Sequence, residues 1–279
     1  MNKSLFDPLG GIFVIFKKEF FSNLKSIRMI ILIVFFTLIV LGTVYAGFSL
    51  MSLMESNPEI EVDLSEIILQ QGPAFVLGMT AGIISVFGTL VPIILSSDTI
   101  VREKIENSLN LLLCRPISRR SIMIGKFLGM AGALAIPVLI VNTFAIIITS
   151  NISEKGIEFG QASGFILYTL IFLLIFVVIG QLISIFSKTT TTAFLLGIFI
   201  WFVFIFGILI IQYFVQDYSS QISLLNPGNS YNVCIQHALG TLEENSTEAI
   251  PLWGYYLNFI LWLFIPLTLA VEIFNRKED

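Results

Sequence analysis

Residues 164–187 read GFILYTLIFLLIFVVIGQLISIFS, a run without a single charged side chain. The hydrocarbon core of a bilayer is about 30 Å thick, and roughly 20 apolar residues in a helix cross it. The run also lacks the alternation of apolar and polar residues that marks a strand of a membrane barrel. Since only helices and closed barrels satisfy their main chain inside a membrane, this run predicts a transmembrane helix.

Five further runs of the same kind lie on either side of it, and the whole chain is 56% hydrophobic and only 12% charged. The sequence therefore predicts an all-α polytopic membrane protein with six transmembrane helices in one domain, residues 1–279. Besides residues 164–187, the predicted spans are approximately 29–51, 74–96, 127–149, 193–215 and 252–271.

Basic residues gather on one side of these spans. Every lysine and arginine except Lys155 lies before the first span, in the second-to-third or fourth-to-fifth loop, or after the last span. Short loops rich in lysine and arginine stay in the cytoplasm, so we expect a multi-pass plasma-membrane protein with both termini cytoplasmic. The net charge of −4 disfavours a nucleic-acid partner, whose phosphates require a basic face.

The segment before the first span, residues 1–28, contains aromatic and aliphatic residues at helical steps, with lysines largely on another face. This pattern predicts an amphipathic helix in the inner headgroup layer of the bilayer. Two interpretations stay open, an anchor that fixes topology and a surface that docks a partner. The interface residues are Phe13, Phe16, Lys17, Phe20 and Leu24.

The loop between the second and third spans, residues 97–126, is dense in charge. If the second span continues into it as a helix, Asp98 and Arg102 are four residues apart, as are Arg102 and Glu106, so both pairs can form intrahelical ion pairs. Such pairs are weak individually, and charge alone is compatible with an ordinary basic loop.

An apolar stripe in the same loop indicates more than a solvated connection. Ile105, Leu109, Leu112 and Leu113 keep helical spacing until Pro116 ends the helix. A stripe of this kind packs against the rest of the chain, the membrane surface or another protein.

Residues 97–129, SDTIVREKIENSLNLLLCRPISRRSIMIGKFLG, resemble the second-to-third-helix loop of permease subunits of type-2 ABC transporters, and most of all the branch associated with copper-enzyme maturation. Two more stretches fit this family. Residues 16–28, FKKEFFSNLKSIR, resemble its amphipathic N-terminal helix, and residues 224–231, LLNPGNSY, resemble a turn in its last outer loop, here residues 216–251. The chain departs from the family at Asn107-Ser108, where members often have Gly-Thr, which affects the shape of the turn.

The resemblance implies a permease subunit, working as an exporter, that pairs as a homodimer. Each copy rests a cytoplasmic coupling helix, between helices 2 and 3, on one of two copies of a cytoplasmic ABC ATPase subunit. ATP and Mg²⁺ are then bound by that partner, and the chain itself needs no cofactor. The residues that the resemblance assigns to ATPase coupling are Asp98, Arg102, Glu103, Leu109, Leu112, Leu113, Pro116 and Arg119.

The residues are consistent with an energy source that lies on a separate ATPase chain. The only Gly-Lys pair, Gly125-Lys126, precedes Phe127 and lacks the glycines of a phosphate-binding loop. No ionisable residue falls inside the six predicted spans, which disfavours ion-coupled transport. An intramembrane enzyme is disfavoured by the absence of paired acids in a span and by a single histidine, predicted to be on the outer side. An ATP-coupled assembly or regulatory complex without bulk transport stays open.

Two further patterns have simpler interpretations. Cys234 and His237, three residues apart and predicted on the outer side with Met51 and Met54, are soft metal ligands. A core thiol and a hydrogen-bonded imidazole explain them without a metal, so we predict no metal site. Glycines four apart, at 78 and 82 and at 125 and 129, allow close helix packing.

Overall fold

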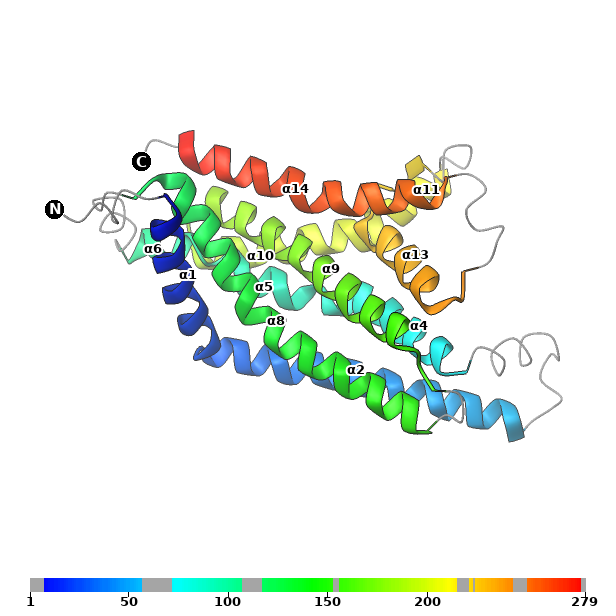
Figure 1. Cartoon of the computed structure of the whole chain (residues 1–279). Helices are drawn as coiled ribbons and strands as arrows, with labels where there is room; N and C mark the ends of the chain where they lie inside the picture. The colour runs from blue at the N-terminus through cyan, green and yellow to red at the C-terminus, as the bar shows by residue number, and fades with distance from the viewer. Residues whose placement is uncertain are drawn as a thin grey trace.

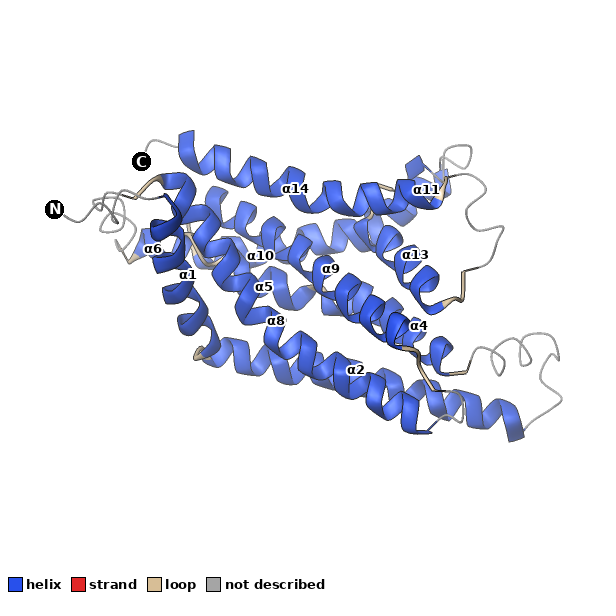
Figure 2. Cartoon of the chain, in the orientation of Figure 1, coloured by secondary structure: helices blue, strands red, loops and turns tan. Residues whose placement is uncertain are grey.

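The computed structural model describes residues 8–56, 72–106, 117–152, 156–214, 221–222, 224–242 and 250–276. Over these ranges every regular element is helical (Figure 2). An all-helical chain is what the continuous apolar runs predict, because main-chain groups in a bilayer are satisfied within each helix.

Six helices are long and apolar enough to cross a membrane, and each coincides with one of the six predicted spans. The helices extend beyond most of the predicted spans, into flanking residues that carry charge. They are Ile27–Leu53 in α2 (Ile27–Ser56), Pro73–Ile105, Arg119–Ile152 (α8), Phe159–Phe186 (α9), Thr190–Gly207 and Leu252–Arg276 (α14).

The second and fifth spans are built from several helical pieces. The second contains α4 (Pro73–Ile83), the π-helical turn η2 (Ile84–Gly88), α5 (Leu90–Ser97) and α6 (Val101–Ile105). The fifth consists of α10 (Thr190–Phe202) and the π-helical turn η3 (Val203–Gly207), followed by α11 (Ile208–Phe214). Figure 1 shows α6, the start of α8 and the last turn of α14 at one end of the bundle, and α11 and the start of α4 at the other. These are called here the α6 end and, after the helix α13 (Pro227–Leu239), the α13 end.

The fourth span, α9, lies at the centre of the bundle. In its most apolar window 61% of the residues are buried, against 11% in the span Thr190–Gly207. Close packing around it rests on glycine: a side chain at Gly180 would overlap Ser96 of α5, and one at Gly197 of α10 would come within 2.8 Å of Ile93. α5 is therefore held tightly between α9 and α10.

A further helix, α13 (Pro227–Leu239), lies inside the region predicted as an outer loop, residues 216–251. Asn226 caps its first turn and Gly240 ends it in the left-handed conformation, with φ of 71°. Its side chains are anchored in the core, because the Tyr231 ring stacks on Phe172 at 4.2 Å and its hydroxyl bonds Thr169 at 2.9 Å.

The N-terminal helix α1 (Pro8–Leu24) crosses the α6 end at a steep angle to the spans and lies against α8 (Figure 1). Of the predicted membrane-interface residues, Phe13 and Lys17 are exposed, whereas Phe16, Phe20 and Leu24 are half-buried. The rings of Phe13, Phe16 and Phe20 stack in sequence along the helix. The buried line of α1 runs instead through Gly11, Ile15 and Glu19, so the helix faces the protein with a surface that the aromatic pattern did not identify.

Candidate functional site: a buried charge cluster at the α6 end

The contact between α1 and α8 is close because α8 presents glycines to it. A side chain at Gly129 would place its Cβ 2.5 Å from the Cβ of Glu19, and one at Gly125 would come within 2.8 Å of Ile15 and 3.0 Å of a main-chain oxygen. Glycine is the only residue that fits these positions without displacing α1. The pair predicted from the sequence to permit close packing therefore does so, and it brings Glu19 directly against α8.

Four charged side chains meet at this contact and form what is here called the charge cluster. Lys126 of α8 lies 3.1 Å from the Glu19 carboxylate of α1 and 2.8 Å from the Glu103 carboxylate of α6. Lys18 of α1 approaches the same two carboxylates, at 3.3 Å from Glu19 and 2.9 Å from Glu103. Three separate helices are thus joined by two lysines and two glutamates with no net charge.

The inner part of the cluster is withdrawn from water. The Lys126 side chain is 1% exposed and the Glu19 and Glu103 side chains 9% and 11%, whereas Lys18 at 51% faces outward. A buried charge is tolerated only when it is paired, and removing one partner of such a pair strands the other. Although partial burial lowers the pKa of Lys18, its hydrogen bond to Glu103 and its attraction to Glu19 and Glu103 raise the pKa above its usual value overall.

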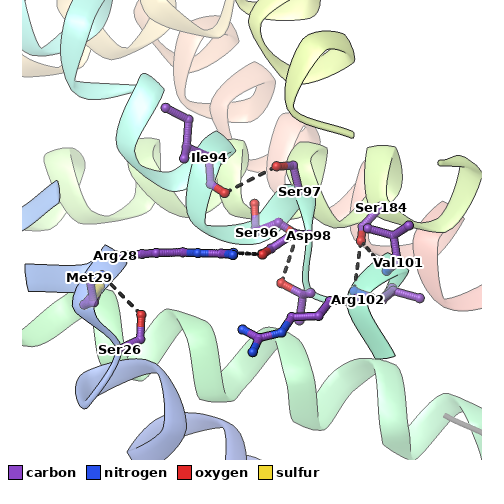
Figure 3. A network of polar contacts seen from close by, with 12 residues as sticks. Ser26, Arg28, Met29, Ile94, Ser96, Ser97, Asp98, Val101, Arg102 and Ser184 are labelled. Atoms are coloured by element: carbon purple, nitrogen blue, oxygen red, sulfur yellow. Dashed lines mark hydrogen bonds and ion pairs between the residues drawn. The ribbon is translucent and has the colours of Figure 1, made fainter. Parts of the chain in front are cut away.

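The start of α6 is fixed from another direction by α9. The hydroxyl oxygen of Ser184 accepts hydrogen bonds from the main-chain N–H groups of Ile100, at 2.9 Å, and Val101, at 3.0 Å (Figure 3). These are donors that the first turn of a helix leaves unpaired, so a side chain of α9 acts as the cap of α6. The ammonium of Lys104 also donates to the Ile185 carbonyl oxygen at 2.9 Å.

A further ion pair links the junction before α6 to the start of the first span. The guanidinium of Arg28 at the start of α2 points at the carboxylate of Asp98, directly after α5 (Figure 3). The same guanidinium lies over the Phe194 ring of α10, 5.8 Å from its centre. The Ser26 hydroxyl caps α2 by accepting from the Met29 N–H at 3.3 Å. The α5–α6 segment therefore contacts α1, α2, α8 and α9 through specific polar groups.

Of the residues predicted to couple the chain to an ATPase, the structure describes Asp98, Arg102, Glu103 and Arg119. Arg102 pairs with Glu106 at 2.9 Å, one of the two intrahelical pairs predicted, whereas the Asp98 carboxylate contacts Arg28. Glu103 points into the charge cluster, and Arg119 begins α8. The remaining ones, Leu109, Leu112, Leu113 and Pro116, lie outside the described residues.

Glu19 and Lys126, the two innermost members of the cluster, are not among the functional residues that the sequence predicts. Lys126 directly precedes the predicted third span, and the sequence predicts it in the basic loop, in a Gly-Lys pair at the start of that span. Instead α8 begins at Arg119 and carries Lys126 inward. A helix can continue past the charge because Glu19 and Glu103 neutralise it. The available signals were the single acidic residue within α1, Glu19, and the glycines at positions 125 and 129 that bring α1 close.

The α13 end holds the other polar residues singled out from the sequence. Cys234 is fully buried in the core beside α9, and the Nδ1 of His237 is hydrogen-bonded to the Tyr256 hydroxyl at 2.9 Å. Among the residues that the structure describes, no cluster of histidine, cysteine or acidic side chains has the arrangement of a metal site. A Cβ added at Gly78 or Gly82 would meet no other part of the described residues within 4 Å, so this pair does not mediate a close helix contact there.

The six spans, the N-terminal helix packed across one end and the anchored helix α6 at the end of the second span define a polytopic membrane protein. Residues 13–278 match the family described as ABC-2 family transporter protein, and the chain belongs to this family of transporter permeases.

Two curated relatives carry the name "Probable ABC transporter permease protein NosY". The protein of Stutzerimonas stutzeri is 26% identical over 207 residues, covering 67% of this chain and 75% of the relative. That of Pseudomonas aeruginosa is 26% identical over 223 residues, covering 74% and 81%. The family predicted from residues 97–129 is confirmed.

Proposed function

We propose that this permease is the membrane subunit of an exporter, and that the connection between α6 and α8 receives a separate cytoplasmic ATPase. Two permease copies and two ATPase copies form the working complex. The observation that supports this proposal is the charge cluster, in which Lys126 lies 2.8 Å from Glu103 and 3.1 Å from Glu19 and so joins α6, α8 and α1.

A segment that receives force from another protein has to be fixed to the helices that it moves. α6 immediately precedes the residues 107–116 in which the sequence places the coupling leucines, and it is bound to α8 and α1 through charges and to α9 through Ser184. A displacement of the docking connection therefore acts on several spans at once. Opening of the route between the two permease copies follows from their combined tilt.

The ionic character of the junction matters for this role. Separating Lys126 from both carboxylates would leave its charge without a partner in a nearly dry environment, which costs several kcal/mol. The four side chains therefore move as a unit, and α1 follows α6 instead of separating from it. An apolar contact of the same area would slide more readily because it has no directional partner.

The orientation of the subunit follows from the distribution of its basic residues. The α6 end contains Arg120, Lys126, Arg276 and the lysines of α1. Short loops rich in lysine and arginine stay in the cytoplasm, so this end would be cytoplasmic. The ATPase would then meet the α6 end where ATP is available. The α13 end would face the opposite side.

The test uses the permease co-expressed with its ATPase, purified in mild detergent and reconstituted in nanodiscs. We expect Leu112→Asp to abolish ATPase binding. Glu103→Gln is expected to retain the ATPase but to lose at least fivefold of the change in ATP hydrolysis that the permease imposes on it. The matched control is Glu106→Gln, one turn away, which removes only the exposed pair with Arg102, whose side chains are 53% and 57% exposed.

Each part of the proposal has its own contradicting result. A stable complex formed by Leu112→Asp would place the docking surface elsewhere. ATP hydrolysis by Glu103→Gln equal to that of Glu106→Gln would remove the charge cluster from the coupling path. Vesicles that hydrolyse ATP in a permease-dependent way but accumulate no solute would favour the assembly or regulatory complex instead of an exporter.

A further inference from the structure

A second polar region lies far from the charge cluster, in a cavity of about 200 Å³ between η2, η3, α9 and the start of α13. Its wall includes Ser85 and Thr89, the rings of Phe176 and Trp201, and the amides of Asn229 and Asn232. Neither the family description nor the names of the relatives assign a ligand to it.

The cavity lies deep in the bundle, because the first residues of α13 line it while the last residue of α13 lies beside the first turn of α9. The last residue of α13, Leu239, accepts a hydrogen bond at its carbonyl from Gln161, in the first turn of α9. The first residues of α13 line the cavity together with Phe176 of the same helix α9. Fifteen residues of helix separate Gln161 from Phe176, a rise of roughly 22 Å. The cavity is therefore about halfway through the membrane span.

Both π-helical turns contribute to the wall, and their main-chain oxygens are used by side chains of the cavity. The Trp201 indole N–H donates to the Val86 carbonyl of η2 at 2.8 Å, and the Asn226 amide donates to the Phe204 carbonyl of η3 at 3.2 Å. π-helical turns are uncommon and recur at functional sites. Here both turns line the cavity, and the Val86 carbonyl of η2 fixes the indole at its edge.

The chemistry of the wall is neutral throughout. No aspartate, glutamate, lysine, arginine or histidine is among the residues that line it. The hydroxyls of Ser85 and Thr89 donate to carbonyls of their own helix, at 2.6 and 3.0 Å, and so present their oxygens as acceptors. The side-chain amide of Asn232 makes no hydrogen bond to the part of the chain that the structure describes, and it is available to a ligand as donor and acceptor.

This combination selects a class of ligand. A charged solute at this depth would lose its hydration without gaining a counter-charge. An uncharged ring with hydroxyl or amide groups would gain hydrogen bonds from the polar wall while its apolar face packs on Trp201 and Phe176. The volume is below the roughly 300 Å³ at which sites for drug-sized ligands begin, so one ring fills it.

We propose that this cavity binds an uncharged, hydroxyl- or amide-bearing ring of the size of one sugar residue. The ring comes either from a free solute or from the headgroup of a glycolipid that reaches the cavity from the membrane. That the ring is part of the transported molecule rests on the proposed function, whereas binding itself does not.

The test uses the full chain in nanodiscs without ATPase, with tryptophan fluorescence as the readout. Trp253, exposed at the start of α14, is replaced by phenylalanine in every variant, so that Trp201 and Trp262 report. The probes form a charge series on one ring: methyl glucoside and N-acetylglucosamine are neutral, glucuronate is anionic and glucosamine is cationic. We expect a saturable change with the neutral probes and at least tenfold weaker binding of the charged ones.

Two variants locate the binding site. Asn232→Leu and Thr89→Val are each expected to weaken binding of the neutral probe at least fivefold. Thr268→Val is the matched control for the second, because Thr268 makes the same local hydrogen bond as Thr89, at 2.9 Å to a carbonyl three residues earlier, but lies exposed on α14. Thermal unfolding of each variant separates a local loss of binding from a failure to fold.

A second arm distinguishes the sources of the ring. Nanodiscs doped with monoglucosyl diacylglycerol are compared with undoped ones by thermal unfolding, with diacylglycerol as control. Stabilisation by the glycolipid alone assigns the cavity to a lipid headgroup, and a fluorescence response to free sugar assigns it to a soluble ligand. No response in either arm, equal binding of glucuronate, or unchanged binding by Asn232→Leu overturns the proposal. Binding without any solute accumulation in ATP-driven vesicles would overturn the transport role alone.

Discussion

The two ends of the bundle are held together by different chemistry. At the α6 end, helices are joined by ion pairs, including the charge cluster, the Arg28–Asp98 contact and a pair between Arg120 and Glu272 at 3.2 Å. Around α13, they are joined by neutral hydrogen bonds and stacked rings, as between Tyr231, Thr169 and Phe172. In the proposed function the ion pairs fix a junction that moves as one body, and in the proposed binding site neutral groups surround a space that a ligand enters without a charge penalty.

The most severe test of this difference is removal of the buried lysine. Lys126→Met would leave Glu19 and Glu103 facing each other with only the half-exposed Lys18 between them, and we expect a loss of about 3–5 kcal/mol in unfolding free energy. Thermal and denaturant unfolding in detergent measures this loss of unfolding free energy. The double variant Glu103→Gln with Lys126→Met should lose less than the sum of its two single variants, since the charges act on one another. Strict additivity would contradict a shared cluster.

The close approach of α1 to α8 is tested by a single methyl group. Gly129→Ala would force its Cβ against Glu19 and the main chain of α1, and the expected cost is about 1–3 kcal/mol. Gly42→Ala is the matched control, because a Cβ added at Gly42 of α2 would meet no described residue within 4 Å apart from the backbone of its own helix. The control should be neutral or gain up to about 1 kcal/mol, as alanine is the better helix former. Equal effects of the two changes would show that α1 is not packed on α8 in the membrane.

Around α13, where the contacts are neutral, loss of one interaction should lower the unfolding free energy by less than at the charge cluster. Tyr231→Phe removes the buried hydrogen bond to Thr169 while keeping the ring on Phe172, and we expect a loss of about 1 kcal/mol in unfolding free energy. Tyr256→Phe removes a hydrogen bond of the same length to His237 on an exposed surface, and it should change little. A loss above about 3 kcal/mol for Tyr231→Phe would contradict the division between the two ends.

The smallest expected effect concerns pH. Because the folded protein raises the pKa of Lys18, its contribution is fully present below its ordinary pKa in the unfolded chain and is lost only as pH rises through the higher folded value. The stability difference between wild type and Lys18→Met should therefore stay constant between about pH 7 and 9, at about 0.2–1 kcal/mol for a half-exposed group. A difference that disappears within this window would show that Lys18 is not held by the two carboxylates.

The six spans and the family were predictable because each rests on a local pattern. Bilayer thickness dictates the length of an apolar run, and residues 97–129 carry a motif that can be read without a fold. The charge cluster could not be read in this way. Glu19 and Lys126 are 107 residues apart, and hydropathy places a boundary at Lys126 because nothing local shows that its charge is neutralised.

The depth of α13 was hidden for the same reason. Asn226, Asn229 and Asn232 make the start of this helix look like a solvated loop, and its burial depends on distant groups. Asn258 of α14, for instance, donates to Ser230 at 2.7 Å and to the Leu224 carbonyl at 3.0 Å. Local composition predicts polarity correctly but cannot tell a polar group in water from one that is satisfied by another helix.

The separation of 107 residues between Glu19 and Lys126 also has a consequence for synthesis of the protein. When α1 leaves the ribosome, neither Lys126 nor the glycines of α8 have been made. During insertion of the first two spans, Glu19 therefore stays hydrated, because α1 has no α8 to pack against. The helix docks only after the third span has begun to enter the bilayer, so release of a chain shorter than about 130 residues would leave α1 exposed to quality-control proteases.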